Sequence, residues 1–440
     1  MSLVPRALEA VAGWREPAPA HPSLTVDPAR FEAAWAEFRE RMATNYPFHH
    51  PRYAGQMLKP PHPVAIAAYT AALHVNANNH ALDGGPATSA MEVEVVEWLA
   101  RMFGLPDESL GHLTSSGTIA NLEALWVARE LHPDKAVVYG ANAHYTHARM
   151  CAVLGVRAFE APADVVGRID LDAVEALCQA GEVGTLVVTA GTTGTGTVDD
   201  IARAVVLRER YGVRVHVDAA YGGFFTLLAR SEAPLIPAAP FLAIAGADSV
   251  VVDPHKHGLQ PYGCGAVLFR DPGVGRHYKH DSPYTYFTSG DLHLGEISLE
   301  CSRAGAAAAA LWLTLRSLDL GPILAAGVRA AQRWAGLIAD SDALTLHREP
   351  ELDILTFFPA GSRASAIDAS CERVLADGMA SEDPVFLSTL RIAAGAFAAA
   401  HPTVEMDADG VRVLRSVLMK PEHEPHVPWL HERVTAIASR

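Results

Sequence analysis

The stretch SVVVDPHKHGLQPYGCGAVLFRD, residues 249–271, places a single lysine between two apolar runs. The first run, residues 250–252, ends in Asp-Pro-His-Lys-His, and the second, residues 266–269, follows a glycine-containing turn. Lysine is a flexible, strongly hydrated charge, but burial lowers its pKa until the neutral amine can act as a nucleophile. The pattern therefore indicates that Lys256 is presented at the end of a strand for chemistry.

The residues around this stretch alternate short apolar strands with helices from about 111 to 270. Strands are predicted at 136–141, 185–191, 214–221, 249–254 and 264–269, and helices at 121–132 and 171–181. Such alternation predicts an α/β fold in which a mostly parallel sheet is covered by helices on both faces. Ligands of such folds bind near the carboxyl ends of the strands, so functional residues are expected there.

The flanking regions have a different character. Helical spacing predicts helices at 28–43 and 89–105, separated by an irregular His-, Pro- and aromatic-rich piece at 45–63. A long helix is predicted after Arg303, followed by strand-like segments at 351–359 and 388–397 and a helix at about 408–419. We divide the chain into a helical N-terminal segment (1–100), a large domain (101–320) and a smaller C-terminal α+β domain (321–440).

The composition favours a small-molecule partner. The chain has 440 residues with 35 Lys and Arg against 50 Asp and Glu, and this net charge of −15 disfavours nucleic acids and anionic membranes. Five widely spaced cysteines without a CxxC pair predict neither disulfides nor a metal site. Because no signal-peptide pattern and no long apolar run occur, a cytoplasmic location is expected.

Further polar residues come at predicted strand ends. LTSSGTIANLEAL, residues 113–125, combines hydroxyl residues and a glycine at a helix start, which suits an anion, although helix capping by Ser115 or Ser116 explains it equally well. His144 follows one strand, a Gly/Thr loop at 189–200 follows another, and Asp218 ends a third. A buried carboxylate such as Asp218 needs a partner, and a cationic ring nitrogen is suitable.

Four features follow one another along the chain: a loop suited to an anion, a histidine after a strand, an aspartate at a strand end and a lysine after a strand. A single ligand explains all four. A phosphorylated aromatic aldehyde needs an anion site, a stacking group, a carboxylate for its ring nitrogen and an amine to condense with the aldehyde. With HHPRYAGQM (49–57), HVDAAYGG (216–223), VDPHKHGLQPYGCG (252–265) and LGEISLECSRAG (294–305), the sequence resembles the pyridoxal-phosphate-dependent group II amino-acid decarboxylases.

The resemblance implies a fold and a set of residue roles. The implied fold is the type I fold of pyridoxal-phosphate-dependent transferases, which is aspartate-aminotransferase-like, and the implied cofactor is pyridoxal 5'-phosphate (PLP). Lys256 resembles the lysine that carries the cofactor, Asp218 the partner of the pyridine nitrogen and His144 the stacked imidazole. The implied phosphate and ring contacts are Ser116, Gly117, Thr118, His255 and Ala220. His257 departs from the tryptophan common in the family.

The resemblance also implies a homodimer with shared active sites, to which the N-terminal segment contributes. In HYKHDSPYTYFTSGD, residues 277–291, Tyr284 or Tyr286 corresponds to a proton donor on a loop from the partner subunit, with packing as the alternative role of either ring. Ser289 and Gly290 resemble a segment that reaches the partner's phosphate site. Substrate contacts are expected from Gln56, Asn78 (or Asn76) and Arg303; a structural ion pair is the alternative for Arg303.

The function expected from these residues is decarboxylation of an L-amino acid to an amine and carbon dioxide. Two alternatives keep the cofactor: a carbon-carbon lyase, or a decarboxylating oxidative deaminase that forms an aldehyde. A third is a catalytically silent binding protein that retains the fold, against which the intact Lys256, Asp218 and His144 argue.

Overall fold

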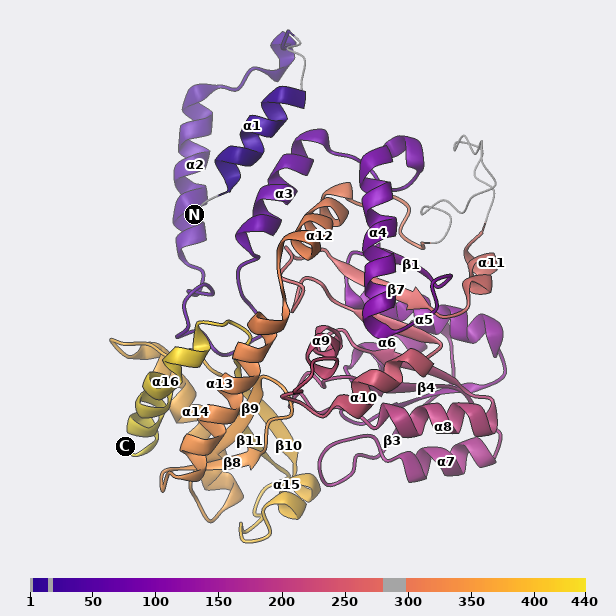
Figure 1. The fold of residues 1–440 in the computed structure, drawn as a ribbon. Helices are drawn as coiled ribbons and strands as arrows, with labels where there is room; N and C mark the ends of the chain where they lie inside the picture. Colours follow the sequence, from indigo (N-terminus) through magenta and orange to yellow (C-terminus); the bar gives the residue numbers. More distant parts are fainter. Residues whose placement is uncertain (1–2, 15–18, 280–297) are drawn as a thin grey trace.

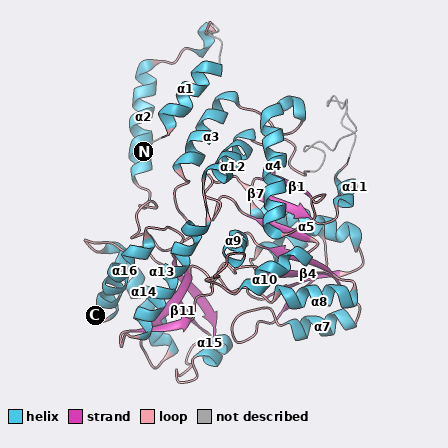
Figure 2. Cartoon of the chain, viewed as in Figure 1, coloured by secondary structure: helices cyan, strands magenta, loops and turns pink. Residues whose placement is uncertain are grey.

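A computed structural model describes residues 3–14, 19–279 and 298–440. Figure 1 shows a large domain built around one sheet, a smaller domain around a second sheet, and helices α1 and α2 at the edge of the molecule. Figure 2 shows the helices packed around both groups of strands. The expected α/β architecture with a smaller C-terminal domain is confirmed; the boundaries at residues 100 and 320 stay a prediction.

The large sheet has seven strands in the order β1-β7-β6-β5-β4-β2-β3. Pairing among β6, β5, β4, β2 and β3 is parallel, and β7 runs antiparallel to both of its neighbours. The strands are β1 (Leu110–Thr114), β2 (Ala136–Gly140), β3 (Ala158–Ala161), β4 (Val183–Thr189), β5 (Arg214–Asp218), β6 (Ser249–Val252) and β7 (Gly265–Phe269). All five strands expected in this region are present.

Both faces of this sheet are buried, which explains the near-continuous apolar strands. In β6, Val250 and Val252 pack on one side, where the core includes residues of α4, α7 and α8, whereas Val251 packs on the other side with α5. The helices are α4 (Pro86–Phe103), α5 (Gly117–Leu131), α6 (Thr146–Leu154), α7 (Leu171–Gln179), α8 (Ile201–Tyr211), α9 (Thr226–Ala229), α10 (Ala238–Leu242), α11 (Gly275–Tyr278) and α12 (Gly305–Ser317).

The small domain has an antiparallel sheet in the order β10-β11-β9-β8. Its strands are β8 (Leu344–Arg348), β9 (Ile354–Pro359), β10 (Ser388–Ala393) and β11 (Gly410–Val417), and its helices are α13 (Gly321–Ala339), α14 (Ala364–Ala380), α15 (Ala394–Ala400) and α16 (His423–Ala438). The first helices of the chain are α1 (Val4–Trp14), α2 (Pro28–Ala43) and α3 (Pro63–Val75). The fully buried Trp334 of α13 lies in the core of the small domain.

Three sequence predictions in the last third of the chain need correction. The helix predicted at 408–419 is wrong, because this segment is the strand β11. Its Val411 and Val413 are β-branched, flank an arginine and pair with β10, and the later residues of the same strand pair with β9. The segment at 388–397 is a strand only in its first half and continues as α15. The long helix after Arg303 is two helices, α12 and α13.

Within the described ranges, no single helix is long and apolar enough to cross a membrane. Helices α12 and α13 reach the necessary length and apolar character only when they are taken together, and the chain bends by 85° between them.

The irregular piece at 45–63 is tied to the small domain by backbone hydrogen bonds. The amide of Ala54 donates to the carbonyl oxygen of Phe386 at 2.9 Å, and the amide of Val417 donates to the carbonyl oxygen of Ala54 at 2.8 Å. Ala54 itself is fully buried in the core of the small domain. This anchoring carries the next residues of the chain, including Gln56, to the boundary between the two domains.

Candidate active site

A cleft of about 240 Å³ lies where the strands of the large sheet end. Loops that follow β1, β2, β4, β5 and β6 all contribute to it, as expected for the carboxyl edge of a parallel sheet. Its lining includes every described residue that the sequence analysis assigned to the cofactor: Ser116, Gly117, Thr118, His144, Asp218, Ala220, His255 and Lys256. The remaining lining residues are Asn121, Tyr145, Thr146, Thr189, Gly191, Thr193, Tyr221 and Asp253.

One wall of the cleft is the start of α5. The hydroxyl of Ser116 accepts a hydrogen bond from the amide of Ile119 at 3.4 Å, so this residue caps the helix at the edge of the cleft. At position 117 the helix start comes so close to Asp253 that glycine fits best, because a Cβ atom there would lie 2.6 Å from a carboxylate oxygen of Asp253. The free amides of the first turn and the helix dipole make this wall suitable for a phosphate.

The lysine lies close to this wall, because Asp253 is next to both Gly117 and Lys256. The Lys256 ammonium lies 3.0 Å from Oδ2 of Asp253, and its side chain keeps 19% of its surface exposed, so it is reachable from the cleft. The neighbouring His255 is fixed by a 2.8 Å hydrogen bond from Nδ1 to the carbonyl oxygen of Cys264. No role was assigned to Asp253 from the sequence, although it belongs to the stretch 249–271 with which the sequence analysis begins.

Asp218 lies at the end of β5 and is held from two sides. Its Oδ2 is 2.8 Å from Nε2 of His147, and its Oδ1 accepts a hydrogen bond from the amide of Ala220 at 3.1 Å. Burial would raise the pKa of this carboxyl, but the contact with His147 and the charge of Lys256 outweigh it and hold the pKa below its usual range. Asp218 is therefore a fixed negative charge at the inner end of the cleft.

His144 and His147 lie near each other with different surroundings. The Nδ1 atom of His144 accepts a hydrogen bond from the amide of Thr146 at 3.2 Å, and burial lowers the pKa of this imidazole. A neutral, half-buried ring at the cleft wall is suited to stacking. His147 was missed from the sequence; it follows His144 by three positions and lies near the start of α6.

A second, larger cleft of about 860 Å³ runs from the first toward the small domain and shares His144, Tyr145 and Thr193 with it. Gln56 lines this second cleft, as does Arg415 of β11, which is 4% exposed. The Arg415 guanidinium donates to the carbonyl oxygens of Thr193, Gly194 and Gly55 and to the side chains of Gln56 and Ser388. All of these hydrogen-bond partners are neutral, so a buried positive charge lies in the wall of the second cleft.

The other predicted substrate residues lie elsewhere. Arg303 forms an ion pair with Glu92 in which the two side chains are 7% and 1% exposed, and Asn78 accepts a hydrogen bond from the Arg303 amide at 3.0 Å. Neither residue lines the two clefts. Tyr284, Tyr286, Ser289 and Gly290 lie outside the described residues.

The residues of the first cleft fit a phosphorylated pyridine aldehyde. The start of α5 offers amides to a phosphate, Asp218 offers a buried carboxylate to a ring nitrogen, and Lys256 offers an amine. The volume suits a single-ring compound. The fold and the cleft thus define a type I PLP-dependent enzyme.

Comparison with solved structures supports this fold. The chain superposes on rice TDC, solved with PLP and tryptamine, with a TM-score of 0.81 at 18% identity over 99% of this chain and 98% of that one. Mouse CSAD gives a TM-score of 0.79 at 20% identity, covering 99% and 92%.

Sequence comparison identifies the family. Residues 37–358 match the pyridoxal-dependent decarboxylase conserved domain, and the chain belongs to this family. A probable L-tyrosine/L-aspartate decarboxylase of Methanopyrus kandleri is 35% identical over 61% of this chain and 70% of that protein. An L-aspartate/L-glutamate decarboxylase of Pyrococcus horikoshii is 30% identical over 72% and 82%. The protein is a PLP-dependent amino-acid decarboxylase, and hence a carboxy-lyase.

Proposed function

We propose that this chain releases carbon dioxide from an L-amino acid held between the two clefts, with Lys256 as the residue that carries PLP. The observation that supports this most strongly is the meeting of Lys256, Asp218, His144 and the start of α5 around one cleft. The bound cofactor supplies an electron sink for the pair left when the carboxylate departs.

Each residue has a separate task in this proposal. Asp218 keeps a negative charge at the inner end of the cleft, which favours a protonated ring nitrogen. His144 stacks on the ring, and Ser116, Gly117, Thr118 and His255 hold the phosphate, with Ala220 packed beneath the ring. The product needs a proton at its α-carbon, which Tyr284 or Tyr286 supplies from the partner subunit.

Arg415 takes the role of the carboxylate anchor. Its positive charge is buried at the boundary of the clefts and has only neutral hydrogen-bond partners, so an anionic substrate group gains a charge-assisted contact there. Gln56, 3.4 Å from the Arg415 guanidinium, lies where it contacts the same substrate. Arg348 and Arg391 line the same cleft together with Asp164, and Arg391 is also paired with Asp409, so Arg348 and Arg415 supply the positive charge that favours a second carboxylate on the substrate.

The proposed substrate is therefore an acidic L-amino acid. L-Aspartate and L-glutamate, which appear in the names of the curated relatives, are tested first, with L-tyrosine as the neutral comparison. Release of carbon dioxide and one amine from an acidic substrate is the expected result. An aldehyde product would favour the oxidative alternative, and turnover of L-tyrosine alone would refute the acidic preference.

The role of Lys256 has its own test. Borohydride reduction of the PLP-loaded enzyme followed by peptide mapping is expected to label Lys256, and Lys256→Ala is expected to fold but lose the visible absorbance of the bound cofactor. Label on another lysine would refute the assignment.

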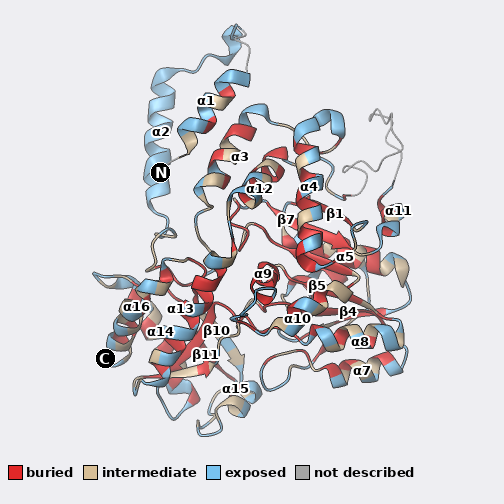
Figure 3. Cartoon of the chain, in the orientation of Figure 1, coloured by how far each residue is buried: buried red, intermediate tan, exposed pale blue. Residues whose placement is uncertain are grey.

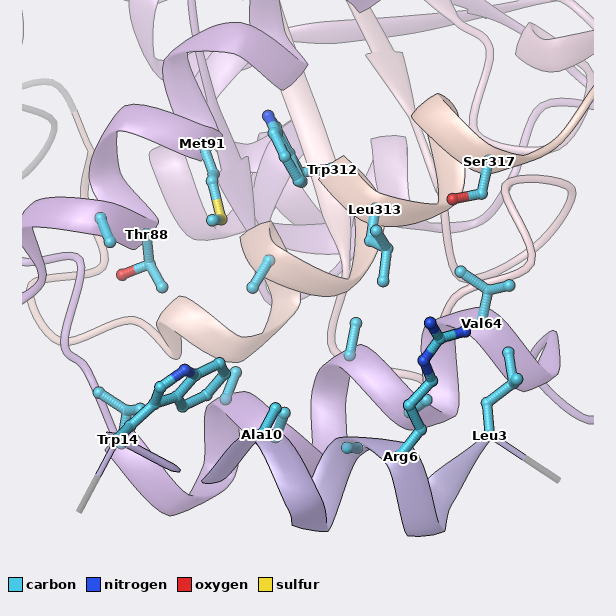
Figure 4. A pocket seen from close by; sticks show the side chains of 18 residues that line it. Leu3, Arg6, Ala10, Trp14, Val64, Thr88, Met91, Trp312, Leu313 and Ser317 are labelled. Atoms are coloured by element: carbon cyan, nitrogen blue, oxygen red, sulfur yellow. The ribbon is translucent and has the colours of Figure 1, made fainter. Parts of the chain in front are cut away.

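We also infer a cytoplasmic homodimer with the N-terminal helices at its interface. No residue of α2 is buried, and its Phe31, Trp35 and Phe38 are each close to half exposed, as Figure 3 shows for the whole helix. A separate groove of about 910 Å³, lined by residues of α1, α3, α4 and α12 and by none of α2, has a mostly apolar lining. Figure 4 shows Trp14 of α1 and Leu313 of α12 among the side chains around it.

A second copy of the chain is the proposed occupant of this face, because apolar area of this extent is usually covered. Trp35→Glu, at a side chain that is 46% exposed, is expected to yield a monomer in analytical ultracentrifugation, whereas Val206→Glu, at a valine of α8 that is 57% exposed, leaves the dimer intact. An unchanged dimer in Trp35→Glu would refute this interface.

A further inference from the structure

His257 lies next to Lys256 and is buried, with only 2% of its surface exposed. Its Nδ1 is 3.1 Å from the carbonyl oxygen of Tyr221, and its Nε2 is 2.8 Å from Oδ2 of Asp353. The hydroxyl of Tyr221 donates to the other oxygen of Asp353 at 2.5 Å. The three side chains form one closed group, which is called the latch below.

The hydrogen bonds of the latch fix its charges. A carbonyl oxygen only accepts, so Nδ1 of His257 carries a hydrogen. An ionised Asp353 can only accept, so it accepts from the Tyr221 hydroxyl and from Nε2 of His257, and a ring that donates from both nitrogens is positive. Burial opposes ionisation of Asp353, but the charge and hydrogen bond of His257 and the Tyr221 hydroxyl outweigh it and keep the pKa of this carboxyl low. The latch therefore contains a buried ion pair.

This ion pair joins the two domains behind the cofactor cleft. Asp353 precedes β9 in the small domain, where its carbonyl oxygen accepts from the amide of Leu418 at 2.8 Å. Helix α13 packs closely over it, because a Cβ atom at Gly327 would lie 3.3 Å from Cβ of Asp353. On the other side, Tyr221 lines the cofactor cleft and His257 follows the lysine directly. The tryptophan expected here from the resemblance has a single donor and could not bridge two acceptors.

We propose that the latch of His257, Asp353 and Tyr221 positions Lys256 for bond formation with the cofactor, through an ion pair held by the small domain. His257 and Asp353 are positioning residues, because they do not line the cleft, whereas Tyr221 does. The proposal rests on the proposed attachment of PLP to Lys256. In that reaction the lysine nitrogen bonds to the aldehyde carbon and one water leaves, so the rate depends on how the amine is held.

The test measures the rate at which apoenzyme gains its visible absorbance after addition of PLP, with no substrate present. Asp353→Asn and His257→Gln are each expected to slow this loading at least tenfold. The double variant His257→Gln/Asp353→Asn replaces the ion pair with two neutral amides and is expected to load within threefold of the wild type. The matched control is Glu123→Gln, which breaks the fully buried 2.8 Å pair of Glu123 with His112 away from the latch. It is expected to load within twofold of the wild type.

Three results would overturn the latch: single variants that load at the wild-type rate, a double variant as slow as the single ones, or a control that is slowed as much. If Asp353→Asn does not fold, His257→Gln and the double variant decide the question. A wrong assignment of Lys256 as the PLP-carrying residue would give a different result, because borohydride would then label another lysine in the wild-type enzyme.

Discussion

Replacing Arg303 with methionine separates its two candidate roles. Arg303 donates to Glu92, to the carbonyl oxygen of Leu113 at 2.9 Å and to that of Asn79 at 3.1 Å, all in the interior. Methionine keeps much of the volume but leaves the Glu92 carboxylate, 1% exposed, without its counterion. Removing one partner of a buried ion pair costs about 3–5 kcal/mol.

That loss is large enough to measure. At roughly 2.1 cal/mol/K of unfolding entropy per residue, a chain of this length has an unfolding entropy of roughly 0.9 kcal/mol/K. The expected fall in Tm is therefore about 3–5 °C if the chain unfolds as one unit. The matched control is Arg316→Met on α12, which breaks an ion pair with Glu94 whose side chains are 61% and 46% exposed. Such a pair contributes about 0–1 kcal/mol, so Tm should change by about 1 °C or less.

The assay combines thermal unfolding followed by circular dichroism with steady-state kinetics. Because Arg303 does not line either cleft, its KM for the amino acid is expected to stay within about twofold of the wild type, an order-of-magnitude bound for a residue without substrate contact. A variant that melts like Arg316→Met but has a strongly raised KM would refute the structural role and restore Arg303 as a substrate contact.

Three further predictions concern the site and its surroundings. Asp218→Asn should retain some PLP binding, measured by absorbance, but lose most turnover, because the amide lacks the charge that favours a protonated ring nitrogen; near-wild-type turnover would contradict this role. One of Tyr284→Phe and Tyr286→Phe should lose most amine yield with little change in substrate affinity, and mixing it with Lys256→Ala chains should restore activity in heterodimers; amine formation at the wild-type rate by both would exclude a tyrosine donor. His216 is fully buried and burial lowers its pKa from 6.5 to about 3, so below pH 6.5 the unfolded chain binds a proton that the folded chain does not. Stability should therefore fall between pH 6.5 and pH 3, by up to about 1.4 kcal/mol per pH unit from this group, and His216→Asn should flatten the dependence of the urea midpoint on pH.

The sequence predicted the positions of the site residues in the fold where polar side chains follow the ends of predicted strands. Asp218 ends one predicted strand and Lys256 comes four residues after another, and the carboxyl edge of a parallel sheet brings such residues together whatever their separation along the chain. The same reasoning placed His144 and the start of α5 at the cleft. These positions depend on the direction of the strands, which the alternation of strands and helices predicts.

The residues missed were those whose roles depend on packing between distant elements. Arg415 was missed because the segment 408–419 was predicted as a helix. As a strand, this segment brings Arg415 to the loop at Gly194, which precedes it by more than 200 residues in the chain. His147 is the second residue of α6, and nothing in the local sequence shows that its ring reaches Asp218. The partnership of His257 with Asp353 crosses the domain boundary, so no spacing in the sequence could reveal it.

The hydrogen bonds that tie residue 54 to residues 386 and 417 have a consequence during synthesis. Ribosomes add about 5–20 residues per second, so the partner of an early residue emerges roughly 20–70 s after it. Throughout that interval the aromatic segment around Tyr53, which is 5% exposed in the finished fold, lacks the surface that buries it. The nascent chain therefore carries an unburied apolar segment until residues 386 and 417 have been made, and chaperones that bind exposed apolar segments can bind it during that time.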